Sequence, residues 1–225
     1  MTEELMEKLG VKKVFTIPLF GGIPVTESIV VTWIIMAVFI ILAIVMTRGL
    51  RTRNISKRQA FIEWVVTKLD GIVGGMVHGR ATVFKEYLIT VLLYIGLANI
   101  VGIFGLKSPT KDMNITIALA LMSIVLVEAA GIIFLGIKRR LHKFIEPTPV
   151  ILPINLMEIV TKPLSLCMRL FGNVIGAFVI MALVEIVVPI GIPMVLSVYF
   201  DFFDGFLQAY VFVFLTGLYL SEAVE

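Results

Sequence analysis

Five apolar segments of this chain are each long enough to cross a lipid bilayer, and this feature restricts the fold more than any other. A helix spans the hydrocarbon core with about 20 apolar residues. Only 16% of the 225 residues are charged, whereas soluble domains carry about 25%. We therefore predict an all-α polytopic membrane protein. The predicted spanning helices cover residues 28–46, 84–105, 115–137, 154–188 and 194–221.

A sixth segment, residues 57–79, shows a different pattern. Apolar and charged residues alternate there at helical spacing, which predicts an amphipathic helix lying at the membrane interface rather than crossing the bilayer. The apolar members are Phe61, Trp64, Val65 and Leu69, and the charged members are Glu63, Lys68 and Asp70.

Basic residues cluster after two of the predicted spans. Under the positive-inside rule both clusters lie in the cytoplasm, so residues 1–27 are external and the C-terminus is cytoplasmic. The net charge of +3 does not indicate a nucleic-acid partner, because these residues lie beside apolar segments. The N-terminus lacks the features of a signal or transit peptide, which favours a bacterial inner membrane. The clusters are Arg48, Arg51, Arg53, Lys57 and Arg58, then Lys138, Arg139, Arg140 and Lys143.

The helix predicted over residues 154–188 is longer than a bilayer is thick. It would extend about 52 Å against a hydrocarbon core of about 30 Å, so it must tilt, kink or leave the core. Pro163 is a natural site for a kink. We expect a single membrane domain, in which peripheral helices over 28–143 precede a long tilted helix hairpin over 150–225.

Arg169 lies in the middle of that long apolar helix. Its guanidinium cannot lose its charge in a protein. Holding such a charge at bilayer depth costs between about 3 and 17 kcal/mol, depending on how the cost is estimated. An arginine at this depth indicates an ion path.

Small and polar residues recur every three or four positions around Arg169, so they share one helix face. Such a polar stripe can face a moving partner or an aqueous cavity. It can also be a contact between helices, held by polar groups and by small residues that permit close approach. Both interpretations stay open for Ser165 and Gly176. The polar stripe consists of Glu158, Lys162, Ser165, Arg169, Gly172, Asn173 and Gly176.

The last helix carries Asp201, Asp204 and Gln208 at a spacing that predicts one shared face. In an antiparallel hairpin, Gln208 and Arg169 differ in depth by roughly 7–8 Å, which long polar side chains can nearly bridge. The two aspartates lie nearer the outer surface, where they can line an entry for ions. Asp201 can equally be a solvated residue at interface depth.

Three further polar residues lie in or near the spans. Glu185 is about 24 Å along the helix from Arg169 and is either an interface carboxylate or part of an ion relay. Glu128 lies inside a span, where a relay role and an ion-pairing role are both open. Asn99 is a single amide in another span, and we interpret it as a helix-packing residue.

The chain lacks the motifs of nucleotide-dependent or metal-dependent enzymes. It contains no phosphate-binding G-x-x-x-x-G-K-[ST], no G-x-G-x-x-G and no H-E-x-x-H. A single cysteine, Cys167, and two distant histidines, His78 and His142, provide neither a zinc site nor a nucleophilic triad. We therefore expect no catalytic residues, no cofactor and no metal.

Three stretches resemble subunit a of the F-type ATP synthase. The segment from Asn155 to Asn173, which ends in Arg-Leu-Phe-Gly-Asn, is similar to the signature of that family. The final segment from Gln208 to Ser221 is similar to its last helix, and the loop from Lys107 to Thr116 to its external loop. Ala98-Asn99 also fits the family pattern.

The resemblance implies a function. Subunit a is the stator in the membrane, packed against a ring of c subunits that each carry a carboxylate, with two offset half-channels leading H⁺ or Na⁺ to and from that ring. Arg169 matches the essential arginine that keeps the half-channels apart, and Asn173 and Gln208 match its polar neighbours. Other partners are the b-subunit peripheral stalk and the soluble F1 head, where the ATP chemistry takes place.

The chain departs from the family pattern at two positions. Phe178 stands where many members have a glutamate, and Asp201 stands where some have a histidine. The resemblance therefore implies an outer half-channel lined differently here, with Asp201, Asp204 and Glu185 as candidates. The substitutions are compatible with sodium transport but do not choose between Na⁺ and H⁺.

Two other functions fit an intramembrane arginine. A secondary transporter can use one to bind an anion, but such transporters usually show internal repeats or paired broken helices, which are not evident in this sequence. A structural membrane anchor needs no polar stripe on either helix of the hairpin.

Overall fold

The computed structural model describes residues 13–17, 23–51, 55–104, 108–143, 152–188 and 191–225. Within these residues, five helical segments are long and apolar enough to cross a membrane, which confirms the predicted all-α polytopic fold. The predicted bounds differ from the observed ones by a few residues. The segments are Glu27–Thr47, Gly79–Ile100, Met113–Leu135, Leu152–Val187 and Val195–Val224.

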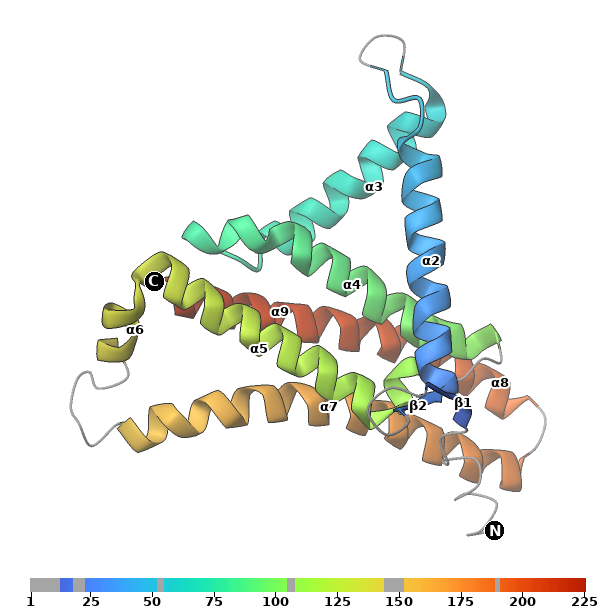
Figure 1. Ribbon diagram of the computed structural model, residues 1–225. Helices are drawn as coiled ribbons and strands as arrows, with labels where there is room; N and C mark the ends of the chain where they lie inside the picture. Colours follow the sequence, from blue (N-terminus) through green and yellow to red (C-terminus); the bar gives the residue numbers. More distant parts are fainter. Residues whose placement is uncertain (1–12, 18–22, 52–54, 105–107, 144–151, 189–190) are drawn as a thin grey trace.

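The elements of the described chain follow one another as shown in Figure 1. They are β1 (Lys13–Ile17), β2 (Ile23–Thr26), α2 (Glu27–Thr47), α3 (Lys57–Gly74), η1 (Gly79–Phe84), α4 (Lys85–Ile100), η2 (Val101–Phe104), η3 (Pro109–Lys111), α5 (Met113–Leu135), α6 (Ile137–Lys143), α7 (Leu152–Val187), α8 (Ile192–Ser197), the π-helical η5 (Val198–Asp204) and α9 (Gly205–Val224).

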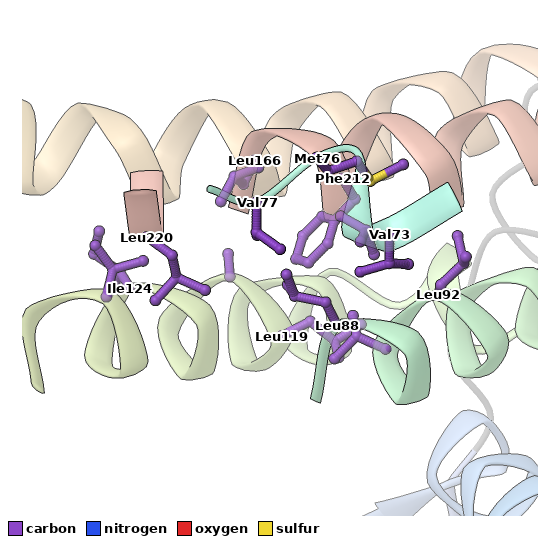
Figure 2. Close-up of a cluster of buried hydrophobic side chains, with 14 of the residues drawn as sticks. Val73, Met76, Val77, Leu88, Leu92, Leu119, Ile124, Leu166, Phe212 and Leu220 are labelled. Carbon is purple, nitrogen blue, oxygen red and sulfur yellow. The ribbon is translucent and has the colours of Figure 1, made fainter. Parts of the chain in front are cut away.

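Helices α4, α5, α7 and α9 form the bundle that contains the main apolar core. Helix α9 packs against both α4 and α5, and α5 also packs against α7. Figure 2 shows side chains from these helices meeting in one cluster, among them Leu88 of α4, Leu166 of α7 and Leu220 of α9. Lipid tails are as apolar as leucine, so close van der Waals packing of these side chains, rather than their removal from water, stabilises the bundle.

Most of α2 stands away from this bundle, and α3 joins it at its C-terminal end, where Val73 is buried in the core (Figure 1). Near its first turns, α2 contacts α4 through Val31, Ile35 and Ala98, and the hydroxyl groups of Thr32 and Tyr94 lie 3.1 Å apart. Most of the remaining surface of α2 is exposed. This arrangement leaves a large apolar area for lipid or for other chains.

Helix α3 is shorter than the sequence predicts. Ser56 caps its first turn by accepting a hydrogen bond from the Gln59 backbone N–H at 3.3 Å. The helix ends at Gly74 rather than continuing to residue 79. Beyond it, Met76 and Val77 turn into the core, so burial of these two side chains overrides the helical pattern. The interfacial position of α3 stays a prediction.

The segment before the first span contains structure that the sequence did not predict. Strands β1 and β2 form a small antiparallel hairpin. The Thr26 hydroxyl at its end donates a hydrogen bond to the buried Asp112 carboxylate at 3.1 Å. The same carboxylate caps α5 by accepting from the Asn114 backbone N–H at 3.0 Å. The hairpin is thereby joined to the start of α5.

The last two spans differ in regularity. Helix α7 runs for 36 residues and stays helical through Pro163, so its length is about 54 Å. The predicted single helix after the turn is instead α8, the π-helical η5 and α9. A π-helix bonds i to i+5 and often marks a functional site. The α-helical spacing from which one face was predicted for Asp201 and Asp204 therefore does not apply between them.

Candidate functional site

Arg169 lies at the middle of α7 and points away from the bundle. Leu166, Cys167 and Leu170 form the buried face of this part of the helix, whereas the Arg169 side chain is exposed. Among the residues that the structure describes, none forms a hydrogen bond or ion pair with Arg169. The guanidinium therefore lacks a counter-charge from the described part of its own chain.

The rest of the polar stripe near Arg169 also faces outward. Ser165 and Asn173 are exposed. A Cβ atom added to Gly172 or Gly176 would meet nothing within 4 Å. Small residues that serve a helix–helix contact have a neighbouring helix at this distance. Within the described residues, this stretch is therefore open to a partner or to lipid instead of packing against another helix of the chain.

The predicted polar residues of the other hairpin helix lie in different surroundings. Gln208 of α9 is buried, and Asp204 at the end of η5 is half-buried. Glu185 is exposed two residues before α7 ends. The backbone of Asp201 is part of η5, but its side chain lies outside the described part of the structure. No described hydrogen bond joins Gln208 to Arg169.

Two predicted residues do come together at the end of the bundle where α6 lies, which we call the α6 end. Lys162 forms ion pairs with Glu158 at 3.1 Å and with Glu222 of α9 at 3.1 Å. Its ammonium also lies 5.1 Å from the centre of the Tyr219 ring. Sequence analysis missed Glu222 because its partner is 60 residues away. The available signal was a carboxylate in the last turn of an otherwise apolar helix.

A third ion pair lies beside these two. Arg140 of α6 donates two hydrogen bonds from Nη2 to the Glu128 carboxylate, at 3.0 and 3.1 Å. This contact settles the question left open for Glu128, which is an ion-pairing residue in this structure. The sequence placed Arg140 in a basic loop and gave no sign that it reaches back into the span.

These three ion pairs line a cavity of about 120 Å³, which we call the charged cavity. This volume has room for several water molecules among its five charged side chains. It is lined by Val127, Glu128, Arg140, Asn155, Glu158, Ile159, Lys162, Tyr219, Glu222 and Ala223.

At the opposite end of the bundle, which we call the η3 end, hydrogen bonds of neutral side chains join the helices, beside the Asp112 carboxylate that caps α5. The Asn99 amide donates to the Gly205 carbonyl at 2.9 Å and accepts from the Thr110 hydroxyl at 2.7 Å. The Ser108 hydroxyl donates to the Ala98 carbonyl at 2.7 Å. Asn99 thus joins α4 to α9, in agreement with its interpretation as a helix-packing residue.

Phe178, which departs from the family pattern, also lies towards this end. The Lys111 ammonium of η3 lies 4.8 Å from the centre of the Phe178 ring, within the range of a cation–π interaction. Within the described residues, no three His, Cys, Asp or Glu side chains are placed to bind a metal ion. We therefore define the candidate site by the charged side chains of the cavity and by the exposed polar residues around Arg169.

Comparison with known proteins places this arrangement in context. The family model described as "ATP synthase A chain" matches residues 29–221. The chain is 33% identical over 189 residues to "ATP synthase subunit a 1" of Crocosphaera subtropica, covering 81% of this chain and 82% of that one. It is 32% identical over 184 residues to "ATP synthase subunit a, sodium ion specific" of Propionigenium modestum, covering 75% of this chain and 64% of that one.

Proposed function

The chain belongs to the ATP synthase A chain family, and we propose that it passes ions through two half-channels that Arg169 keeps apart. As a member of that family it is a multi-pass membrane subunit with an ion-translocating role, and its partners are other ATP synthase subunits. With the family identified, the transporter and anchor interpretations lose their basis.

The observation that carries the proposal is the exposed position of Arg169 at mid-span, where no described residue of the chain pairs with it. A guanidinium facing lipid costs about 3 kcal/mol or more, so a partner that supplies a carboxylate at this depth is strongly favoured. A ring of c subunits, each with an ionisable carboxylate, would satisfy this requirement. The open glycine positions beside Arg169 would let such a ring approach closely.

In this proposal Arg169 affects both the carboxylates of the ring and the transported cation. Its positive charge stabilises the ion-free carboxylate as that group passes. It also repels a cation that would move directly from one half-channel to the other. Each charge that crosses a potential of 100 mV contributes about 2.3 kcal/mol, and successive transfers turn the ring.

We assign the two half-channels to the two ends of the bundle. The charged cavity at the α6 end, with Glu158 and Lys162, would be the cytoplasmic half-channel, because α6 carries the basic residues expected on that side. The outer half-channel would lead past Asp204, with Glu185 and Asp201 as further candidates, and Asn173 and Gln208 would border the ring contact.

The proposal extends to orientation, partners and organisation. The N-terminus would be external and the C-terminus cytoplasmic in a bacterial inner membrane. The b-subunit stalk would be a second partner, residues 1–225 would act as one membrane domain, and all ATP chemistry would take place in the soluble head. The ion would be H⁺ or Na⁺. The sodium-specific relative makes sodium dependence the first property to measure.

The test is ATP-driven ion uptake into inverted vesicles that contain the assembled complex, at low and high sodium. We expect Arg169→Ala to abolish uptake while leaving assembly intact, and Arg169→Lys to pump poorly because an ammonium lacks the planar fork. Arg139→Ala, which changes an exposed arginine of α6, is the matched control and should pump normally. Normal pumping by assembled Arg169→Ala would overturn the proposal.

A further inference from the structure

We propose that Arg140 is a positioning residue that holds Glu128 and thereby sets the net charge of the charged cavity through which cations pass. This inference rests on the proposed function of the cavity as the cytoplasmic half-channel. It concerns two residues to which neither the polar stripe nor the resemblance gives a role. Its basis is the geometry of their contact and the inventory of charges around them.

The first step is the way in which Arg140 reaches Glu128. Glu128 lies two turns before the end of α5, inside a predicted span. Gly136 follows the helix with φ +81°, a conformation that favours glycine, and it lets the chain reverse into α6. Figure 1 shows α6 folded beside the end of α5. The reversal brings the guanidinium back to a carboxylate that would otherwise be costly at this depth.

The second step is the fit of the guanidinium between helices. A Cβ atom added to Gly131 of α5 would lie 3.0 Å from Arg140 Nε, 3.1 Å from its Cζ and 3.2 Å from the Ala223 carbonyl oxygen. Glycine at position 131 therefore leaves the space in which the guanidinium lies, between α5 and the last turn of α9. The Arg140 side chain is 13% exposed, so its position is well defined by packing.

The third step is the charge inventory of the cavity. Among the described lining residues are three carboxylates, Glu128, Glu158 and Glu222, and two cations, Arg140 and Lys162, whose formal charges sum to −1. Arg140 forms a bidentate contact with Glu128, and Lys162 forms ion pairs with Glu158 and Glu222. This net negative charge would attract a cation entering from the cytoplasm.

Changing the pair therefore changes the attraction in a predictable direction. Arg140→Met would leave a net charge of −2, and Glu128→Gln would leave a net charge of zero. The double variant would restore −1 with two neutral side chains. A purely structural pair behaves differently, because loss of either partner then damages the subunit in the same direction.

The experiment uses the complete complex in inverted vesicles, whose outer face is the cytoplasmic one. ATP-driven uptake is measured while the coupling cation, H⁺ or Na⁺, is varied outside. We expect Arg140→Met to lower the half-saturating concentration by about fivefold and Glu128→Gln to raise it by about fivefold, as one unit charge does across a partly hydrated site. The double variant should return close to the wild-type value.

A further variant and a second measurement distinguish an effect of cavity charge from a purely structural role of Arg140. Arg140→Lys loses the bidentate contact but keeps the charge, and because the inference assigns the effect to net charge, it should shift the half-saturating concentration by less than about twofold. During ATP synthesis, the cation enters from the vesicle lumen, and the dependence on the lumenal cation concentration should stay unchanged in all variants. Shifts of the two single variants in the same direction, or a double variant that adds them, would overturn the inference. That result would leave the proposed function intact if Arg169→Ala still abolished uptake.

Discussion

The two ends of the bundle differ in the contacts that join their helices. At the α6 end, charged side chains from α5, α6, α7 and α9 meet around a cavity. At the η3 end, neutral groups form short hydrogen bonds, and a Cβ atom added to Gly205 would lie 2.7 Å from the Cβ of Asn99. The ion pairs thus border a cavity, whereas the hydrogen bonds of Asn99 accompany the close packing of α4 against α9.

The largest effect on stability is expected at the η3 end from Gly205→Ala. The added methyl group collides with the Asn99 side chain, and overpacking of this kind costs about 1–3 kcal/mol. We expect a clear fall in the midpoint of thermal unfolding in detergent. Gly96→Ala is the control, because an added Cβ there meets nothing within 4 Å. Equal midpoints for both variants would contradict the close approach of α4 and α9.

A somewhat smaller effect is expected from Asn99→Ala. The change removes two hydrogen bonds and leaves the buried Thr110 hydroxyl without its acceptor on Asn99, and polar contacts between membrane helices contribute about 0.6–2 kcal/mol. The same unfolding assay measures the loss. Asn114→Ala, at an exposed position, provides the baseline. A loss no greater than this baseline would mean that the network does not join α4 to α9.

The smallest effect on stability is expected at the α6 end from Glu222→Gln. Its side chain is 56% exposed, and ion pairs of this kind contribute about 0.2–1 kcal/mol. The unfolding midpoint should therefore change little and should depend on salt concentration. Glu86→Gln, another exposed glutamate, is the control. A fall as large as that of Gly205→Ala would show that ion pairs, too, hold the bundle together.

The sequence predicted features that depend on nearby residues. Apolar length located the five spans, and helical spacing located the polar stripe around Arg169. Both are local properties, since a helix repeats its faces whatever it packs against. The interpretation of Asn99 as a packing residue also agrees with the structure, because an amide within a span is stabilised by a neighbouring helix.

Features that depend on distant residues were not predictable in this way. The Lys162–Glu222 pair requires the return of the chain through α8, η5 and α9. The Glu128–Arg140 pair requires the reversal at Gly136. The π-helical η5 and the hairpin of β1 and β2 were also not predicted, because no periodicity in the sequence indicates either element.

The outward position of Arg169 has a consequence for how such a machine is built. Before its partner arrives, a newly inserted chain presents a guanidinium to acyl chains, and the bilayer must thin or admit water to solvate it, at about 3 kcal/mol or more. Docking of the partner removes that defect. Arg169, which we propose keeps the two half-channels apart, would therefore also destabilise the subunit in the membrane before its partner binds, and so favour assembly of the complete complex.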